Sequence, residues 1–167
     1  MGIFVVFTVI LISLDQVVKH LAVTNLANSG IENIFFNLTY HQNASMIGNI
    51  SFNWLIAIFS IILLAVFVVF YINQYTKKVR SPMNLVIFTL IISGGASNLI
   101  DRIARGYVVD YIELNYILPG IVFNVADVFI VLGVILLIGM YAITITDGKV
   151  QTMNEGEEYG QNNIKRQ

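Results

Sequence analysis

Long apolar runs separated by short polar stretches are the main pattern along this chain. Four runs, near residues 2–24, 53–73, 83–104 and 122–146, are each dominated by apolar side chains over roughly 20 residues. A helix of that length can cross the hydrocarbon core of a bilayer, which is about 30 Å thick. The pattern therefore predicts a membrane protein of the all-α class with four transmembrane helices.

Two connecting segments, 25–52 and 105–121, carry a different pattern. In FFNLTYH (35–41) and YIELNYI (111–117), apolar and polar residues alternate with a period of two, which is typical of strands with one buried face. We therefore expect a small β-layer outside the membrane, with its apolar side resting among lipid headgroups.

Composition supports this membrane setting. Hydrophobic residues make up 57% of the 167 residues, charged residues 11%, and the mean hydropathy is +0.78. A soluble domain of this size would not expose so much apolar surface to water. The net charge of −1 argues against a nucleic-acid partner, and the absence of cysteine excludes disulfides and thiolate chemistry.

The distribution of Lys and Arg predicts the orientation. Basic residues occur at 77–80, between the second and third helices, and again after the fourth helix, whereas residues 25–52 contain none. By the positive-inside rule, both termini face the cytoplasm and the β-layer is extracytoplasmic. Residues 1–146 then form one integral membrane domain, and the polar residues 147–167 are expected to form a disordered cytoplasmic tail.

Polar residues within the predicted helices fall at one depth when the helices are drawn with this orientation at ~1.5 Å per residue. They are Asp15, Lys19, Asn98, Asp101, Arg102, Asn124 and Asp127. Within each helix these residues are mostly three or four positions apart, so each helix presents one polar stripe to the bundle interior. Charges buried in a bilayer are costly, by ~2.5–3.5 kcal/mol or more each, so a shared level indicates a functional site or a structural polar cluster.

Some of these residues also have simple structural interpretations. Asp101 and Arg102 are expected to form a structural ion pair near the interface, and Asp15 and Lys19 an intrahelical pair that orients other groups. The small residues of SGGAS (93–97) would let a neighbouring helix approach closely.

Two aspartates lie at the predicted outer surface. Asp110 stands in GYVVDYI, Asp127 heads the fourth helix, and Pro119 and Gly120 can turn the chain back between them. Two carboxyl groups about 3 Å apart share a proton, so one can activate a water molecule while its protonated partner polarises a carbonyl group. Peptide hydrolysis without a metal is one interpretation. An ion-coupled transporter and a purely structural cluster are the alternatives, although a transporter would usually show internal repeats.

Four motifs at these positions resemble those of the lipoprotein signal peptidases (signal peptidase II), which are bacterial intramembrane aspartyl proteases. They are DQVVK (15–19), GGASNLIDR (94–102), GYVVDY (106–111) and FNVAD (123–127). The resemblance implies a multi-pass enzyme of the bacterial cytoplasmic membrane, with its active site toward the extracytoplasmic face and with neither cofactor nor metal. Its partners would be membrane lipids and prolipoproteins, which it would cleave just before a cysteine that carries a diacylglyceryl group. We expect a monomer.

The same resemblance implies roles for individual residues. Asp110 and Asp127 would form the catalytic dyad. Supporting or substrate-contacting roles would fall to Asp15, Lys19, Asn43, Asn98, Arg102 and Asn124.

One motif departs from the family pattern. Asn43 is kept, but Ser45, Met46 and Ile47 stand where the family usually has glycine and two alanines, and Ser97 stands where a glycine usually precedes the asparagine. Replacing a glycine removes close backbone approach or a positive φ, so we expect a reshaped substrate groove. A catalytically weak or specialised paralogue that binds lipoproteins is therefore the alternative to an active peptidase.

Overall fold

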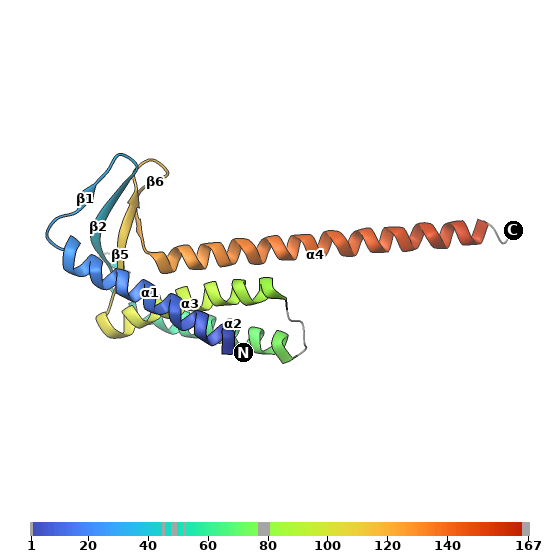
Figure 1. Ribbon diagram of the computed structural model, residues 1–167, viewed down its shortest axis with the longest axis horizontal. Helices are drawn as coiled ribbons and strands as arrows, with labels where there is room; N and C mark the ends of the chain where they lie inside the picture. Colours follow the sequence, from blue (N-terminus) through green and yellow to red (C-terminus); the bar gives the residue numbers. More distant parts are fainter. Residues whose placement is uncertain (1, 45, 48–49, 52, 77–80, 165–167) are drawn as a thin grey trace. The chain divides into compact units, whose positions relative to one another are not determined.

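The computed structural model of the protein is shown in Figure 1. It describes residues 2–44, 46–47, 50–51, 53–76 and 81–164. The chain divides into two compact units, Met1–Gly133 and Val134–Gln167. The first unit contains three helices, the sheet and the start of the fourth helix, whereas the second consists, as far as it is described, of the rest of that helix.

Within the described residues, four helices are long and apolar enough to cross a membrane. They are α1 (Gly2–Leu26), α2 (Asn53–Thr76), α3 (Pro82–Arg105) and α4 (Val125–Ile164). The four predicted helices are therefore confirmed. The fourth begins at residue 125 instead of 122, because the residues just before it form a strand.

The apolar part of α4 ends at Thr146, close to the predicted boundary, and the helix continues to Ile164. The assignment of residues 147–167 to a disordered cytoplasmic tail stays a prediction, as does the cytoplasmic location of both termini.

Helices α2 and α3 differ in how much of each helix is buried. Helix α2 consists mostly of apolar residues and few of them are buried, so its outward side chains need an apolar solvent. Helix α3 is half buried and has clear signals at both ends. Ser81 caps its start by accepting the Met83 backbone N–H, Pro82 follows, and Gly106 ends it in the left-handed region at φ 80°.

A four-stranded antiparallel sheet with the order β1-β2-β5-β6 lies at one end of the helices (Figure 1). Its strands are β1 (Ile31–Glu32), β2 (Phe36–Asn43), β5 (Val108–Leu114) and β6 (Leu118–Phe123), and a separate hairpin joins β3 (Met46–Ile47) to β4 (Ile50–Ser51). Both predicted strands exist, but the second begins earlier than expected, and residues 115–117 form a turn. The predicted β-layer is confirmed, with β6 as a strand that the alternation did not reveal.

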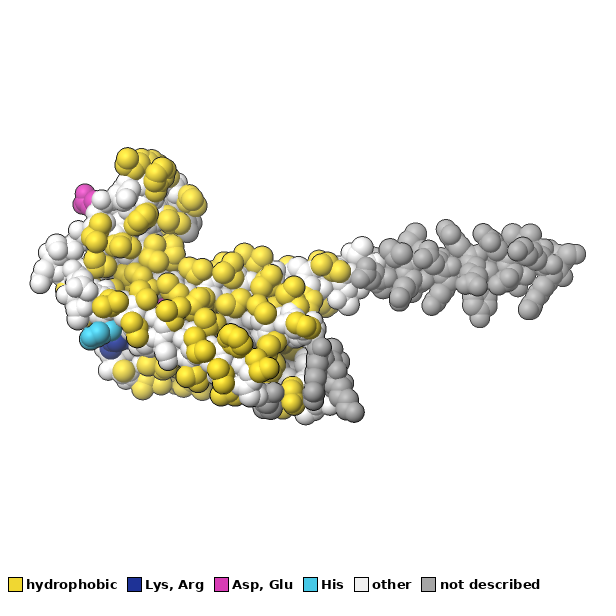
Figure 2. Space-filling view, viewed as in Figure 1, with side chains coloured by type: hydrophobic (Ala, Val, Ile, Leu, Met, Phe, Trp, Pro, Cys, Tyr) yellow, Lys and Arg dark blue, Asp and Glu magenta, His cyan; other side chains and the backbone are white. Residues whose placement is uncertain are grey.

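Helix α3 packs against both α1 and α2, and β2 and β5 contact the same end of this group (Figure 1). One apolar cluster joins Phe4 of α1, Tyr71 of α2, and Phe88 and Ile92 of α3, with the Phe4 and Tyr71 rings stacked at 4.1 Å. Figure 2 shows hydrophobic side chains over most of the coloured surface of the helices. The buried charged residues instead gather at the end that touches the sheet.

Candidate active site

Asp110 lies on β5, which contacts α1 and α3. Its side chain is 2% exposed, and its Cα stands opposite that of His41 in the antiparallel pair. The carboxyl oxygen Oδ2 accepts a hydrogen bond from Asn43 Nδ2 at 2.9 Å, and Oδ1 accepts one from Asn124 Nδ2 at 2.6 Å. The strand therefore places a buried carboxyl group whose two oxygens are each held by an amide.

Asp127 lies in the first turn of α4, three residues after Asn124, and the two residues form a capping box. Asn124 Oδ1 accepts the Asp127 backbone N–H at 3.0 Å, and Asp127 Oδ2 accepts the Asn124 backbone N–H at 3.1 Å. These reciprocal bonds satisfy N–H groups that a helix start leaves unpaired, and a negative charge there interacts favourably with the helix dipole. Asp127 thus also has a structural reason to stand at the head of an apolar helix.

Two asparagine side chains connect the two carboxyl groups. Asn124 Nδ2 donates to Asp110 Oδ1 and also, at 3.2 Å, to Asn98 Oδ1. Asn98 Nδ2 then donates to Asp127 Oδ1 at 2.7 Å. A continuous chain of hydrogen bonds therefore runs from the carboxyl group on β5, through the start of α4 and through α3, to the carboxyl group on α4.

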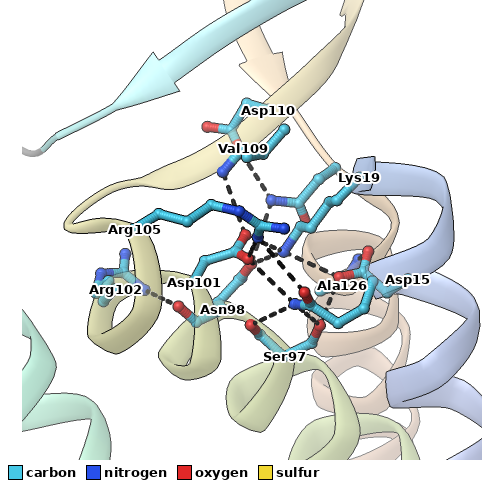
Figure 3. A network of polar contacts seen from close by, with 12 residues as sticks. Asp15, Lys19, Ser97, Asn98, Asp101, Arg102, Arg105, Val109, Asp110 and Ala126 are labelled. Atoms are coloured by element: carbon cyan, nitrogen blue, oxygen red, sulfur yellow. Dashed lines mark hydrogen bonds and ion pairs between the residues drawn. The ribbon is translucent and has the colours of Figure 1, made fainter. Parts of the chain in front are cut away.

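Buried charges form a second cluster beside this chain (Figure 3). Lys19 Nζ lies 2.9 Å from both Asp15 Oδ2 and Asp101 Oδ2, and it donates to Asn98 Oδ1 at 2.8 Å. Asp15, Lys19 and Asp101 are completely buried. The expected intrahelical pair of Asp15 and Lys19 is therefore confirmed, and Lys19 has partners on α3 as well.

The predicted ion pair between Asp101 and Arg102 is wrong. Asp101 pairs with Lys19 and with Arg105 instead. Adjacent residues on a helix point in directions about 100° apart and do not face each other, whereas residues four positions apart do. The helical spacing therefore favours Arg105, and not Arg102, as the partner on α3.

Arg102 and Asn43 approach the carboxyl groups from α3 and β2. Arg102 is half-buried and donates from Nη1 to the Asn98 carbonyl oxygen at 3.3 Å. It interacts electrostatically with Asp127, Asp110 and, to a smaller extent, Asp101, without a close ion pair to Asp101. Asn43 is the last residue of β2 and donates to Asp110 Oδ2, whereas Asn124 donates to the other oxygen, Oδ1. All the predicted site residues therefore lie in one hydrogen-bonded region, and their roles stay predictions.

The predicted reshaping of the groove at 43–48 concerns altered positions whose side chains lie outside the described part of the chain. Ser45 and Gly48 are not described, nor are the side chains of Met46 and Ile47. The effect of these residues on the substrate groove stays a prediction.

Three members of the network were missed by the sequence analysis: Gln16, Ser97 as a bonding group, and Arg105. Gln16 Nε2 donates to Ser97 Oγ at 3.0 Å and to Asp101 Oδ1 at 3.1 Å, and Ser97 Oγ donates to Asp15 Oδ2 at 2.6 Å. Arg105 carried a usable signal, because it lies four residues after Asp101. Gln16 carried none, because its partners belong to another helix.

Burial dominates the electrostatics of β5. Burial raises the pKa of the Asp110 carboxyl group, and the nearby Asp127 adds to this rise, while the hydrogen bonds from Asn43 and Asn124 act in the opposite direction. Burial also raises the pKa of the Tyr111 hydroxyl to about 12, so this group stays protonated and neutral. Asp110 therefore holds a proton more tightly than an ordinary aspartate does.

Among the residues that the structure describes, no group of three or more His, Asp or Glu side chains is placed to hold a metal ion. The expectation that the protein uses neither metal nor cofactor stays a prediction.

Four apolar helices, a small antiparallel sheet and a buried carboxyl site at their junction define a multi-pass membrane protein with a polar site at one end of its helices. Comparison with known proteins shows to which family of membrane proteins the chain belongs. Residues 7–143 match the family described as Signal peptidase (SPase) II. The chain belongs to the signal peptidase II family.

Individual relatives agree with this assignment. The chain is 39% identical over 133 residues to the lipoprotein signal peptidase of Streptococcus thermophilus (strain CNRZ 1066), covering 77% of this chain and 84% of that one. It is 40% identical over 138 residues to that of Clostridioides difficile (strain 630), covering 80% and 90%. A bacterial membrane enzyme solved by the in meso method at 2.3 Å resolution superposes with a TM-score of 0.70 at 28% identity, covering 89% of this chain and 92% of that one.

Proposed function

We propose that this protein is a lipoprotein signal peptidase that hydrolyses the bond between the signal peptide and the mature part of diacylglyceryl-modified prolipoproteins. Membership of the signal peptidase II family supports the substrate class. The observation that carries the chemical part of the proposal is the hydrogen-bonded chain that links Asp110 to Asp127 through Asn124 and Asn98.

In this proposal the two aspartates form the catalytic dyad and hold one water molecule between them. Asp127 takes a proton from the water, the water oxygen attacks the scissile carbonyl carbon, and Asp110 gives its proton to the carbonyl oxygen. When the C–N bond breaks, the proton held by Asp127 passes to the leaving amine, and Asp110 recovers a proton from the collapsing intermediate. We assign the protonated role to Asp110 because burial raises its pKa.

The neighbouring side chains would support this reaction from fixed positions. Asn43, Asn98 and Asn124 hold the carboxyl oxygens through amide hydrogen bonds, so the dyad does not need to reorganise as charge moves. Arg102 places a positive charge near both carboxyl groups, which partly balances the negative charge of the dyad.

The location of the site agrees with a substrate that arrives within the membrane. The polar cluster lies where the helices meet the sheet, and the distribution of Lys and Arg favours the extracytoplasmic side of the bacterial cytoplasmic membrane for that end. There, the diacylglyceryl group and the apolar signal helix of a prolipoprotein would reach the site sideways from the lipid. We propose a monomer that acts without cofactor or metal.

The alternative is a specialised relative that binds lipoproteins and cleaves them weakly. The unusual residues at 45–47 favour it, because they stand close to Asn43 in the sequence, where the family usually has a glycine and two alanines. A cleavage assay separates the two, since a specialised binder would retain the substrate without releasing the signal peptide.

The test is cleavage of a diacylglyceryl-modified prolipoprotein by the purified protein in detergent, with Asp110→Asn and Asp127→Asn compared with the parent. Each variant should lose cleavage to the background rate, because the dyad needs both an acid and a base. Glu113→Gln is the matched control. It lies on the same strand but on the other face, where its carboxyl group binds Asn37 and the Gly120 N–H, so cleavage should continue. Near-parental cleavage by either aspartate variant would refute the dyad.

A further inference from the structure

Each aspartate of the proposed dyad follows a residue whose backbone N–H is held by a second, buried aspartate. The Ala126 N–H, just before Asp127, donates to Asp15 Oδ1 at 2.8 Å. The Val109 N–H, just before Asp110, donates to an Asp101 carboxyl oxygen at 3.2 Å. Figure 3 shows both of these hydrogen bonds beside the charged cluster. The backbone just before each aspartate of the proposed dyad is therefore hydrogen-bonded to a buried carboxylate, on α1 in one case and on α3 in the other.

Lys19 connects the two carboxylates that accept these backbone hydrogen bonds, Asp15 and Asp101. Its ammonium group has three N–H donors. They are directed to Asp15 and Asp101, each at 2.9 Å, and to the side-chain oxygen of Asn98 at 2.8 Å. Asn98 in turn donates to Asp127. Each of the three acceptors of Lys19 is thus one hydrogen bond away from a dyad aspartate or from the residue before it.

The charges of the cluster balance. Two buried carboxylates, Asp15 and Asp101, are matched by the Lys19 ammonium and by Arg105, which pairs with Asp101. Buried charges that only stabilised the contact between α1 and α3 would need this pairing but no bonds to the segments on either side of the dyad. Here both carboxylates bind such segments as well.

We propose that Lys19, Asp15 and Asp101 form a positioning unit that sets the separation and orientation of Asp110 and Asp127. The inference rests on the proposed function and deepens it. No member of the unit contacts the substrate in this account, because each acts through a peptide N–H or through Asn98. A displacement of about 1 Å at a reacting group lowers a rate by roughly 10²-fold, so a unit of this kind has a measurable effect on turnover.

The first test is Lys19→Met, which keeps an unbranched side chain and removes the charge and all three donors. We expect kcat for a diacylglyceryl-modified prolipoprotein to fall by about 10²-fold, with KM close to the parental value. A non-cleavable analogue, in which a methylene group replaces the scissile carbonyl, should bind with parental affinity. Titration with this analogue also counts the folded sites, so that kcat is expressed per competent site.

The second variant, Lys19→Met with Asp15→Asn, guards against misfolding, because it removes one positive and one negative charge together and leaves Asp101 paired with Arg105. We expect the same loss of kcat and the same retained affinity. Thr89→Val is the matched control. Thr89 is a buried residue of α3 that lies outside the unit, and kcat should not change.

The outcomes separate this inference from the proposed function. Loss of kcat with retained analogue binding supports the positioning unit. Parental kcat in both Lys19 variants overturns it, as does a rise in KM without a change in kcat, and as does loss of analogue binding in both variants. In each of these cases the dyad still stands if Asp110→Asn and Asp127→Asn are inactive, since those variants test the proposed function alone.

Discussion

Helix α3 has two ends that pack in opposite ways. Its polar end faces α1 through Ser97, Asn98 and Asp101, which contact Asp15, Gln16 and Lys19. Its apolar end packs through Phe88 and Ile92 against Phe4 and Tyr71. The polar contacts are hydrogen bonds and ion pairs with defined directions, whereas the apolar contacts are between rings and aliphatic chains.

These two kinds of contact differ in how firmly they fix the position of the helices. Lipid tails are as apolar as the side chains of the apolar end, so its contacts gain little from leaving the solvent and hold by close packing. Such contacts tolerate small sliding motions, because dispersion attraction has no strong directional preference. Hydrogen bonds weaken steeply when they are bent or stretched. The polar end therefore specifies the register of α1 against α3, and the apolar end mainly adds cohesion.

Two glycines at opposite ends of the contact between α3 and α4 test this difference between the polar and the apolar end, and we expect the greatest loss of activity from the first of them. A Cβ on Gly94 would overlap the Ala126 carbonyl oxygen, next to Asp127. Gly94→Ala must therefore push the first turn of α4 away from α3. We expect kcat for prolipoprotein cleavage to fall by about 10²-fold or more, measured on folded protein, because the geometry of the proposed dyad would change.

Gly133→Ala is the matched change at the apolar end. A Cβ there would lie 2.6 Å from the Ile91 side chain and 3.2 Å from the Ile87 carbonyl oxygen. This variant should unfold at a lower temperature in detergent, while its folded fraction keeps a kcat close to the parental value. Equal losses of kcat in Gly94→Ala and Gly133→Ala would contradict this difference between the two ends of α3, because both ends would then control the proposed dyad.

A smaller effect should appear when the pH is varied. Because the folded protein holds the Asp110 proton more tightly than the unfolded chain, the free energy of unfolding should decrease as the pH rises from the ordinary aspartate range through the raised pKa of Asp110. Over the same range the proposed dyad would lose its proton, so the cleavage rate should fall by about tenfold per pH unit above that pKa. Unfolding of the parent and of Asp110→Asn across this range would check the assignment, and the same pH slope in both would contradict it.

The sequence predicted the helices well because a long apolar run in a membrane protein has few alternatives to a spanning helix. Strand prediction was weaker. Strand β5 begins at Val108 instead of residue 111, because Val108 and Val109 are both buried and the alternation of polar and apolar residues fails there. Strand β6 was missed, since Pro119 and Gly120 indicate a turn and the following apolar residues look like the start of a helix.

The site shows the same limit at the level of side chains. Asp110 and Asp127 were candidates from their positions, and their catalytic role stays a prediction. Helical spacing correctly placed Asn98 and Asp101 on one buried face. The partners across helices could not be derived, because the contact between Lys19 and Asn98 joins residues 79 positions apart and depends on the register of the packed helices. Local spacing determines the face of a helix, whereas tertiary packing determines what that face contacts.

The smallest effect is expected from one hydroxyl group in the polar end. Ser97→Ala removes the donor to Asp15 Oδ2 at 2.6 Å and the acceptor for Gln16 at 3.0 Å, but it leaves Asp15 with Lys19 and with the Ala126 N–H. A hydrogen bond to a charged group contributes about 1.5–3 kcal/mol, so we expect that loss in the free energy of unfolding and a modest decrease in kcat.

Ser93→Ala gives the matched control one turn earlier on α3. Its hydroxyl group is also fully buried, but it donates within the helix to the Leu90 carbonyl oxygen. This change should leave kcat unaltered. If both serine variants lowered kcat equally, the Ser97 bond to Asp15 would have no special link to the dyad. A decrease in kcat that is confined to Ser97→Ala would show that the position of Asp15 affects the position of Asp127. The link between them is the hydrogen bond from the Ala126 N–H to Asp15.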